Sequence, residues 1–503
     1  MIDFTTKINA QRPYQSANKS QQQSAVDIRY LQRQLESDRG RIITSAATRR
    51  LQQKTQVFPL ERNAAVRSRL THSLEVQQNG RYIVKTLFEK LKGKGLDYGL
   101  LGMETAVESL IEMACLMHDI GNPPFGHFGE GAIIGWYQKH THTIFDKAFS
   151  EQQYIDVTLK EQMIRDLHSF EGNAQAIRLT YSLQRMNLTY VQSACILKYT
   201  RPAWEPRPSS DAQDRYLKKK PGYYLSEQSF LDKMQQALNM QPGSRHPLTY
   251  IMEAADDIAY CLADIEDAVD KDILSIARLK ELLEKTFKRI GGDPEAPSFK
   301  DIQQNQRSFK NIVDYAYQRS EKESINKAHE FFVWLRVGLI HNLVNHAADR
   351  FIDNIEAVYA GQFNGALLED NSPAHSVVET FKQIGFNHVF NHSEVQTLEI
   401  QGYQIITGLL DYYKCLLEMP LAAFESILPP SHKTPYLLES RLLNRLGNKY
   451  IKAYQEAVAE KTETDPNNHL LWELYYRHRL LQDHISGMND QFAHDEYKLL
   501  RVD

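Results

Sequence analysis

The chain has 503 residues, of which 42% are hydrophobic and 24% charged, a composition that is typical of soluble globular proteins and excludes disorder as the dominant state. Lysine and arginine total 59 against 63 acidic residues, so the net charge of −4 excludes a generally basic nucleic-acid-binding chain. Its four cysteines lie far apart, its first residues carry no secretory signal and no apolar run could span a membrane, which predicts a cytoplasmic protein with reduced thiols.

Helical periodicity dominates the chain, and three amphipathic helices stand out. The first begins near Thr71, and the second covers Glu104–His118, where the following Gly/Pro turn stops it. The third begins after Pro247. The residues expected to face the core along the first helix are Leu74, Ile83, Val84, Leu87 and Phe88.

Strand signals are few, and short strands are predicted only at Gly222–Leu225 and Val395–Ile400. We therefore expect an all-α fold with minor short β elements. The chain is divided into an N-terminal segment (residues 1–36), a core (37–280) and a helical C-terminal region (281–503). The last boundary is open, because one compact domain is an alternative.

Residues 117–130, with the sequence MHDIGNPPFGHFGE, are the most informative segment. His118 and Asp119 end a buried helix, where both side chains can reach one metal ion. The dipeptide alone is weak, because roughly two such pairs are expected by chance and His494–Asp495 is a second example. The Gly/Pro loop and the following His127 and Glu130 make this segment stronger evidence for a functional site than the dipeptide alone.

Two further ligands for such an ion are found elsewhere in the chain. His72 lies at the polar edge of the first helix, and Asp256 interrupts the apolar third helix. A buried carboxylate is unfavourable unless it is paired or bound to a metal. Taken singly, a core histidine and a surface acid are the simpler interpretations. As a set of four, His72, His118, Asp119 and Asp256 favour a metal site.

At these positions the chain resembles the HD-domain metal phosphohydrolases, and in particular the bacterial deoxyguanosine triphosphate (dGTP) triphosphohydrolases. The resemblance implies hydrolysis of dGTP to deoxyguanosine and inorganic triphosphate with Mg²⁺, Mn²⁺ or Co²⁺. It also implies a homo-oligomer, a hexamer in the family, with single-stranded DNA as an allosteric activator. The strings that carry it are RLQQKTQVFPLERNAAVR, CLMHDIGNPPFGHFGE, HSFEGNAQ, LKYTRPAW, KKPGYYLSE, MEAADDIAYCLAD, RFIDN and LLQDHISGM.

The resemblance also assigns residue roles around the four metal ligands. His127, steered by Glu130, is the expected proton carrier, and His168 is a second histidine of the same pocket. The expected phosphate-binding residues are Arg69, Asn173, Lys198, Tyr199 and Lys220.

Sugar and base contacts follow from the same resemblance. Asp256, Tyr260 and Asp264 are spaced to share one helix face. Tyr260 is expected where a 2′-hydroxyl would lie and Asp264 at the 3′-hydroxyl, with Gln56 beside the sugar. The expected base contacts are Phe390, Glu399 and, from a neighbouring subunit, Arg441.

Other functions stay open on the sequence alone. They are a broader-specificity HD dNTPase, a 5′-nucleotidase or phosphodiesterase, and a non-catalytic nucleotide- or single-stranded-DNA-binding protein; the intact ligand set argues against the last. Residues 38–70 hold eight basic residues against two acidic ones, a density that could serve phosphates, an allosteric nucleotide or single-stranded DNA. Those eight are Arg39, Arg41, Arg49, Arg50, Lys54, Arg62, Arg67 and Arg69.

Overall fold

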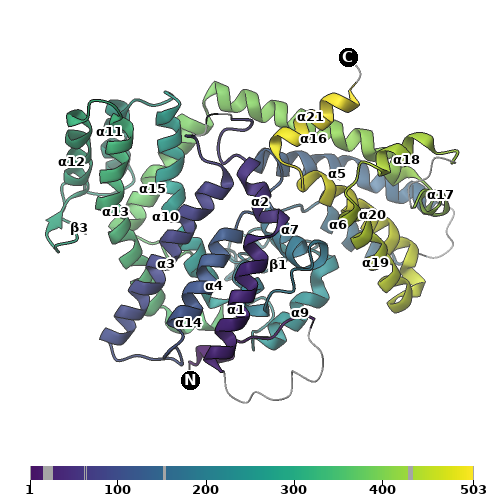
Figure 1. Ribbon diagram of the computed structural model, residues 1–503, viewed down its shortest axis with the longest axis horizontal. Coiled ribbons are helices and arrows are strands. Elements are labelled where there is room, and N and C mark those ends of the chain that lie inside the picture. The colour runs from purple at the N-terminus through teal and green to yellow at the C-terminus, as the bar shows by residue number, and fades with distance from the viewer. Residues whose placement is uncertain are drawn as a thin grey trace.

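Helices form nearly all of the regular structure, as Figure 1 shows, and the prediction of an all-α fold is confirmed. In the part of the chain that is described, strands occur only as two short pairs: parallel β1 (Arg201–Pro202) with β2 (Pro221–Tyr223), and antiparallel β3 (Phe299–Lys300) with β4 (Gln306–Arg307). The computed structural model describes residues 2–14, 27–61, 63, 65–150, 155–428 and 434–501.

Helix α3 (Arg69–Gly93) packs against α4 (Glu104–Met117), α10 (Pro247–Asp270) and α13 (Lys327–Asp353). It starts at a capping box, in which the Ser68 hydroxyl accepts the backbone N–H of the third helical residue. Apolar residues from before and after residue 280 share one core. These helices bring together the segments that carry the predicted metal ligands.

The buried face of α3 differs in part from the predicted one. Leu74 is 50% exposed, whereas Ile83, Val84 and Leu87 are buried as expected and Phe88 is partly buried. The N-terminal half of α3 turns its small and polar residues inward, because α4 approaches closely there. A Cβ at Gly80 would lie 2.7 Å from the Cys115 sulfur.

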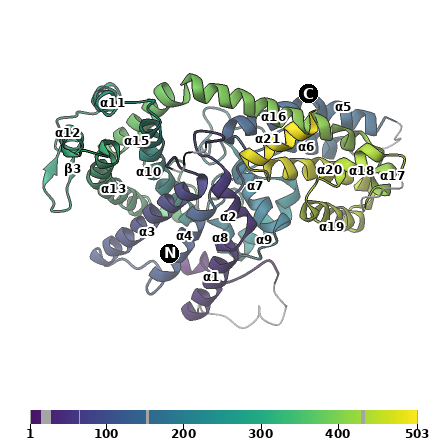
Figure 2. The ribbon, with the colours of Figure 1, turned by 45° about the horizontal axis from the view of Figure 1, so that its top comes forward.

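The strand predicted at Val395–Ile400 is wrong, because these residues belong to helix α16 (Ser393–Glu418). The strand predicted at Gly222–Leu225 overlaps β2 by two residues. Helix α16 packs against α5 (Gly126–Ala148), α20 (His469–Ser486) and α21 (Asp490–Leu500), and Figure 2 shows it running along one edge of the molecule beside α5 and α21.

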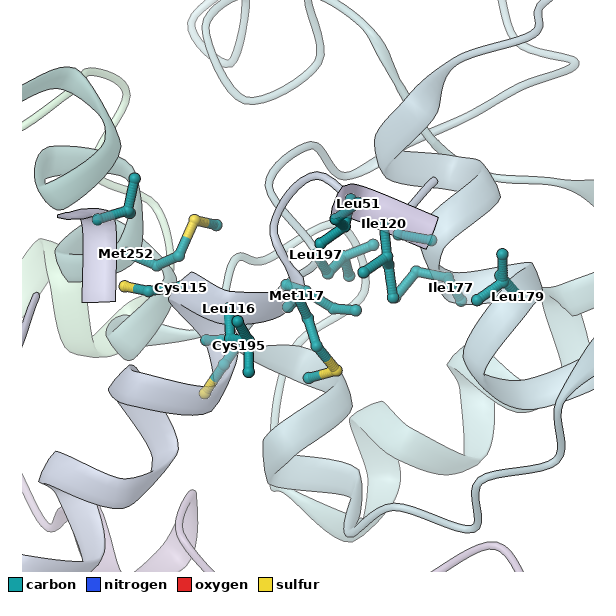
Figure 3. Close-up of a cluster of buried hydrophobic side chains, with 14 of the residues drawn as sticks. Leu51, Cys115, Leu116, Met117, Ile120, Ile177, Leu179, Cys195, Leu197 and Met252 are labelled. Carbon is teal, nitrogen blue, oxygen red and sulfur yellow. The ribbon is translucent and has the colours of Figure 1, made fainter. Parts of the chain in front are cut away.

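A cluster of buried apolar side chains lies where α4 ends (Figure 3). Cys115 and Met117 come from α4, Ile120 from the loop after it and Met252 from α10. Ile177 of helix α7 (Gly172–Arg178) belongs to the same cluster. The segments that carry His118, Asp119 and Asp256 are therefore anchored in close-packed apolar surroundings, which limits their movement.

The remaining elements surround this centre, with α11, α12 and α15 at one end of the view in Figure 1 and α17 to α20 at the other. No helix among the described residues is both long and apolar enough to span a membrane. The remaining bounds are α1 (Ile28–Ile43), α2 (Ala46–Arg50), α6 (Val157–Leu167), α8 (Tyr190–Ala194), α9 (Gln228–Ala237), α11 (Ile276–Arg289), α12 (Phe309–Lys322), α14 (Ile355–Ala360), α15 (Pro373–Ile384), α17 (Leu421–Ser426), α18 (Leu437–Leu443) and α19 (Asn448–Thr464), the 3₁₀ turns η1 (Phe4–Thr6), η3 (Leu51–Gln53), η5 (Leu225–Glu227) and η7 (Pro466–Asn468), and the π-helical turns η4 (Leu179–Leu183) and η6 (Gly385–Phe390).

Candidate active site

The four predicted metal ligands lie together, although they come from three different segments. His72 is on α3, His118 and Asp119 follow the last turn of α4, and Asp256 is on α10. The ligand atoms of His72, His118 and Asp119 all lie within 4.8 Å of one another. Asp256 Oδ1 is 3.2 Å from His72 Nε2 and 3.4 Å from His118 Nε2.

Neighbouring groups orient the His118–Asp119 pair. His118 Nδ1 lies 2.7 Å from the Cys115 carbonyl oxygen, which places the proton on Nδ1 and leaves the Nε2 lone pair free. Arg69 and Asn122 donate to the two Asp119 oxygens, each at 2.6 Å. These hydrogen bonds direct the side chains of His118 and Asp119 toward the point where the Nε2 atoms of His72 and His118 converge.

Electrostatics keep the two carboxylates ionised. Burial would raise the pKa of Asp119, but the charges of His118 and Arg69 hold it at about 2. Burial is likewise outweighed at Asp256, where His118, His72 and Lys198 hold the pKa well below its ordinary value. Two imidazole nitrogens and two carboxylate oxygens form a donor set that fits a divalent metal ion, so the residues present agree with the expected cofactor.

His127 and Glu130 form the hydrogen-bonded pair expected from their spacing. Helix α5 begins at Gly126, so the two side chains lie one turn apart, with His127 Nδ1 2.9 Å from Glu130 Oε2. Glu130 is buried and its other oxygen accepts the backbone N–H of Gly172 at 2.9 Å. Burial would raise the pKa of Glu130, but the hydrogen bond and charge of His127 lower it, so the carboxylate stays available to orient the ring.

A cavity of about 480 Å³ opens beside the four ligands and is lined by His127. Every expected phosphate-binding residue also lines it: Arg69, Asn173, Lys198, Tyr199 and Lys220. Lys198 Nζ lies 3.6 Å from Glu253 and 3.7 Å from Asp256, and Lys220 Nζ lies 3.2 Å from Glu171.

The expected sugar- and base-binding residues line the same cavity, apart from Arg441. They are Gln56, Tyr260, Asp264, Phe390 and Glu399. The rings of Tyr260 and Phe390 are 6.4 Å apart, which makes them one aromatic wall. Burial, with a smaller effect from Asp267, raises the pKa of Asp264 to about 8, and burial raises the pKa of Glu399 to about 7.

Two expected site residues are not brought to this cavity. His168 caps the end of α6, and its ring lies 5.6 Å from that of His142, outside the lining. Burial and the charge of His142 lower the pKa of His168 to about 4. Arg441 is exposed on α18 and also lies outside the lining.

Several lining residues were not identified from the sequence. Glu171 accepts the backbone N–H of Asn173 at 2.6 Å and contacts Lys220, so it holds two expected phosphate-binding groups. Its place between His168 and Asn173 in the string HSFEGNAQ was the available signal. Lys382, paired with Asp257 at 3.0 Å, gave no comparable signal.

Much of the basic stretch at residues 38–70 is engaged within the fold. Arg39 forms an ion pair with Glu112, and Arg50 donates to the Tyr450 hydroxyl at 3.0 Å. Lys54 is buried. Arg62 lies outside the described residues. The charge density of this stretch is therefore partly structural.

Comparison with known proteins gives consistent matches. The HD domain family matches residues 69–192. The chain is 53% identical, over 499 residues and 99% of both chains, to a probable deoxyguanosinetriphosphate triphosphohydrolase of Pseudomonas aeruginosa. It is 47% identical, over 99% of both chains in each case, to deoxyguanosinetriphosphate triphosphohydrolases of Serratia proteamaculans and Yersinia pestis.

Proposed function

The chain belongs to the deoxyguanosinetriphosphate triphosphohydrolase family of HD-domain proteins, and we infer from this membership that it hydrolyses dGTP to deoxyguanosine and inorganic triphosphate. The observation that carries the inference is the convergence of four side chains beside a cavity whose wall includes cationic groups. The four are His72, His118, Asp119 and Asp256, and the cationic groups are those of Arg69, Lys198 and Lys220. A triphosphate carries roughly four negative charges, which need such partners.

We propose Mn²⁺, Mg²⁺ or Co²⁺ as the ion held by the four side chains, because mixed imidazole and carboxylate sites suit these metals. When bound, the ion supplies Lewis-acid polarisation of a phosphoryl oxygen. Arg69 has a second role, because it lines the cavity while it donates to Asp119. It can therefore contact the substrate next to the ligand that it orients.

In the proposed reaction, water attacks the α-phosphorus and the bond from this phosphorus to the 5′ oxygen breaks. His127 gives a proton to the leaving 5′ oxygen. The proton that the attacking water loses passes to solvent, from which His127 is reprotonated, so that deoxyguanosine and triphosphate form with the protons balanced. Glu130 keeps the imidazole in position through its 2.9 Å hydrogen bond. General acid–base catalysis of this kind requires a donor at the cavity wall, where His127 lies.

The cations of the cavity would bind the triphosphate and stabilise its charge as the bond breaks. Lys198, next to Asp256, is placed for phosphates near the metal ligands. The Lys220 ammonium and the Asn173 side-chain amide both donate to Glu171, which holds the two groups next to each other at the cavity wall. His168, outside the cavity, has no step in this proposal.

The sugar would lie against the aromatic wall formed by Tyr260 and Phe390. Close packing of Tyr260 would leave no room for a 2′-hydroxyl, which gives a preference for deoxynucleotides. A pKa of about 8 leaves Asp264 protonated at neutral pH, so it can donate a hydrogen bond to the 3′-hydroxyl oxygen. Gln56 lines the same wall.

Glu399 is proposed to accept the N1–H and N2–H of guanine, which requires the ionised carboxylate. Its pKa of about 7 means that the carboxylate is mostly ionised at pH 8 and mostly protonated at pH 6. We therefore expect KM for dGTP to rise roughly fivefold as the pH falls from 8 to 6, as measured by steady-state kinetics. The loss of ionised Glu399 is about tenfold, and the fuller protonation of Asp264 offsets it about twofold.

The control for this prediction is Glu399→Gln, which has no ionisable group. The KM of this variant should be high at both pH values. Any difference between its KM at pH 8 and at pH 6 then reports the titration of the phosphates and of the other residues. A pH dependence of KM in Glu399→Gln as large as that of the unaltered protein would contradict the assignment.

The proposed function itself is tested by product analysis. Purified protein is incubated with each dNTP and with GTP, with Mn²⁺, Mg²⁺ or EDTA, and the products are identified by phosphorus NMR. We expect dGTP to yield triphosphate and deoxyguanosine. The reaction should require the metal ion, and GTP should be turned over little. Pyrophosphate or single phosphate as the product would instead indicate a different phosphohydrolase.

We also propose a homo-oligomer, a hexamer by resemblance, in which Arg441 reaches the base pocket of a neighbouring subunit. Two observations support this assembly. Arg441 is exposed and does not line the cavity of its own subunit, and the apolar side chains of Leu437 and Leu438 are exposed on the same helix. Light scattering would measure the assembly. Single-stranded DNA is the proposed activator, and its addition to the dGTP assay tests this role.

A further inference from the structure

Asp490, the first residue of α21, joins two walls of the cavity, although it lies far from both in sequence. It is only 3% exposed. Oδ1 accepts the backbone N–H of Phe125 at 3.0 Å, while Oδ2 accepts the backbone N–H and the hydroxyl of Thr55 at 3.2 and 2.6 Å. A carboxylate that accepts three hydrogen bonds is a strong and directional link between these segments.

The first of these segments determines where His127 lies. Phe125 adopts φ 63° and ψ 19°, a left-handed conformation that a non-glycine residue keeps only where its surroundings impose it. Asp490 holds its N–H. Its ring lies against Gly402 of α16, where a Cβ would be 2.5 Å from the Phe125 Cγ atom. Helix α5 begins at the next residue, so the conformation of Phe125 sets the direction in which His127 enters the cavity.

The second segment is the wall that holds Gln56. Thr55 and Gln56 both line the cavity, and Thr55 is fixed by Asp490 on both its N–H and its hydroxyl. The preceding Lys54 is tied in the same way, since its ammonium donates to the carbonyl oxygens of Asn122 and Ser486. The junction of α20 and α21 therefore holds the loop after α4 and the Thr55–Gln56 wall at once.

We propose that Asp490 is a positioning residue for dGTP hydrolysis, which holds the start of α5 so that His127 reaches the leaving 5′ oxygen. The inference rests on the proposed function. Asp490 does not itself line the cavity, so it acts through Phe125 and Thr55. A displacement of a catalytic group by about 1 Å can cost on the order of 10²-fold in rate.

The test begins with Asp490→Ala. We expect kcat to fall roughly 10- to 100-fold, while KM for dGTP and the affinity for Mn²⁺ stay near their original values. Asp490→Asn keeps an acceptor for the Phe125 N–H but not for the Thr55 N–H, so it should recover only part of kcat. The matched control is Asp495→Ala on the same helix, whose side chain is 56% exposed and whose removal should leave kcat unchanged.

A double-mutant cycle separates positioning from a general loss of structure. If Asp490 acts through His127, Asp490→Ala should cost little further kcat in a His127→Ala background. An equal fold-loss in both backgrounds, or a kcat of Asp490→Ala equal to that of Asp495→Ala, would overturn the proposal. If the alanine variant does not fold, the same cycle is run with Asp490→Asn. Its smaller loss of kcat should likewise disappear in the His127→Ala background. Failure of the unaltered protein to hydrolyse dGTP would refute the proposed function, whereas hydrolysis by the unaltered protein that Asp490→Ala does not slow would refute only the positioning role.

Discussion

Alanine in place of His118 or Asp256 is expected to abolish Mn²⁺ binding and dGTP hydrolysis together. Each side chain is one of four donors, and His118 Nε2 lies 3.4 Å from Asp256 Oδ1, so no neighbour can replace a missing one without movement. A bound metal contributes several kcal/mol to stabilisation of transition-state charge, so kcat should fall by at least about 10³-fold. Isothermal titration with Mn²⁺ and the phosphorus NMR assay measure the two losses.

The chain supplies a matched control for this experiment. His494 and Asp495 form a second His–Asp pair, with 3.3 Å between Nδ1 and Oδ1, on the surface of α21. Alanine at both positions should change neither Mn²⁺ affinity nor turnover. A His118→Ala variant that is folded by thermal melting and binds Mn²⁺ as the unaltered protein does would contradict the proposed ligand set.

The convergence of the four proposed metal ligands could be predicted from the sequence, because metal binding restricts the choice of residues. His118 and Asp119 stand in one contiguous string, and Asp256 interrupts a helix that is otherwise apolar. A carboxylate in such a position needs a partner. The structure provides two such partners, because His72 Nε2 and His118 Nε2 lie 3.2 and 3.4 Å from Asp256 Oδ1.

The errors in the predicted fold have physical causes. In the segment 395–400, three of the six residues are β-branched, which favours a strand. In the structure Val395 instead shares one buried face of α16 with Gly402 and Ile405. On α3, the apolar pattern placed Leu74 inside. The close approach of α4 at Gly80 instead turns His72 and Ser73 inward, and Leu74 faces solvent.

The long-range ion pairs outside the candidate site could not be predicted. Helix α20 is buried from Leu471 to Ser486, and two of its charged residues are paired with distant ones: Arg479 with Asp166, and Asp483 with Arg178 at 2.7 Å. Charged residues in a helix normally indicate a solvated face, and no local pattern identifies their partners. The link from Asp490 to Phe125 is of the same kind.

His127→Ala should lower kcat about 10²- to 10⁴-fold, the range that general acid–base catalysis contributes. The affinity for dGTP should stay within a factor of about three, because the phosphate, sugar and base contacts are unchanged. Steady-state kinetics measure kcat, and titration with an analogue of dGTP in which a methylene group replaces the 5′ oxygen measures affinity, because the bond that is broken in dGTP is then a stable carbon–phosphorus bond. A variant that loses affinity but keeps kcat would contradict a role in proton transfer.

Glu130→Gln separates the role of His127 from that of its orienting partner. The glutamine can still accept the Gly172 N–H, which Glu130 holds at 2.9 Å, so the start of α7 should stay in place. Only the charge that faces His127 is lost. We therefore expect a fall in kcat smaller than that of His127→Ala, and no further fall when the two changes are combined, because both act on the same proton transfer.

The exposure of His127 allows a direct test of its chemistry. Its side chain is 79% exposed, so its removal leaves a space that is open to solvent and next to the cavity. Free imidazole should enter this space and restore part of kcat to His127→Ala in a concentration-dependent way, because it supplies the missing proton donor. The same imidazole should not restore activity to His118→Ala, in which a metal ligand is missing. Equal rescue of both variants, or of neither, would contradict the assignment of the proton transfer to His127.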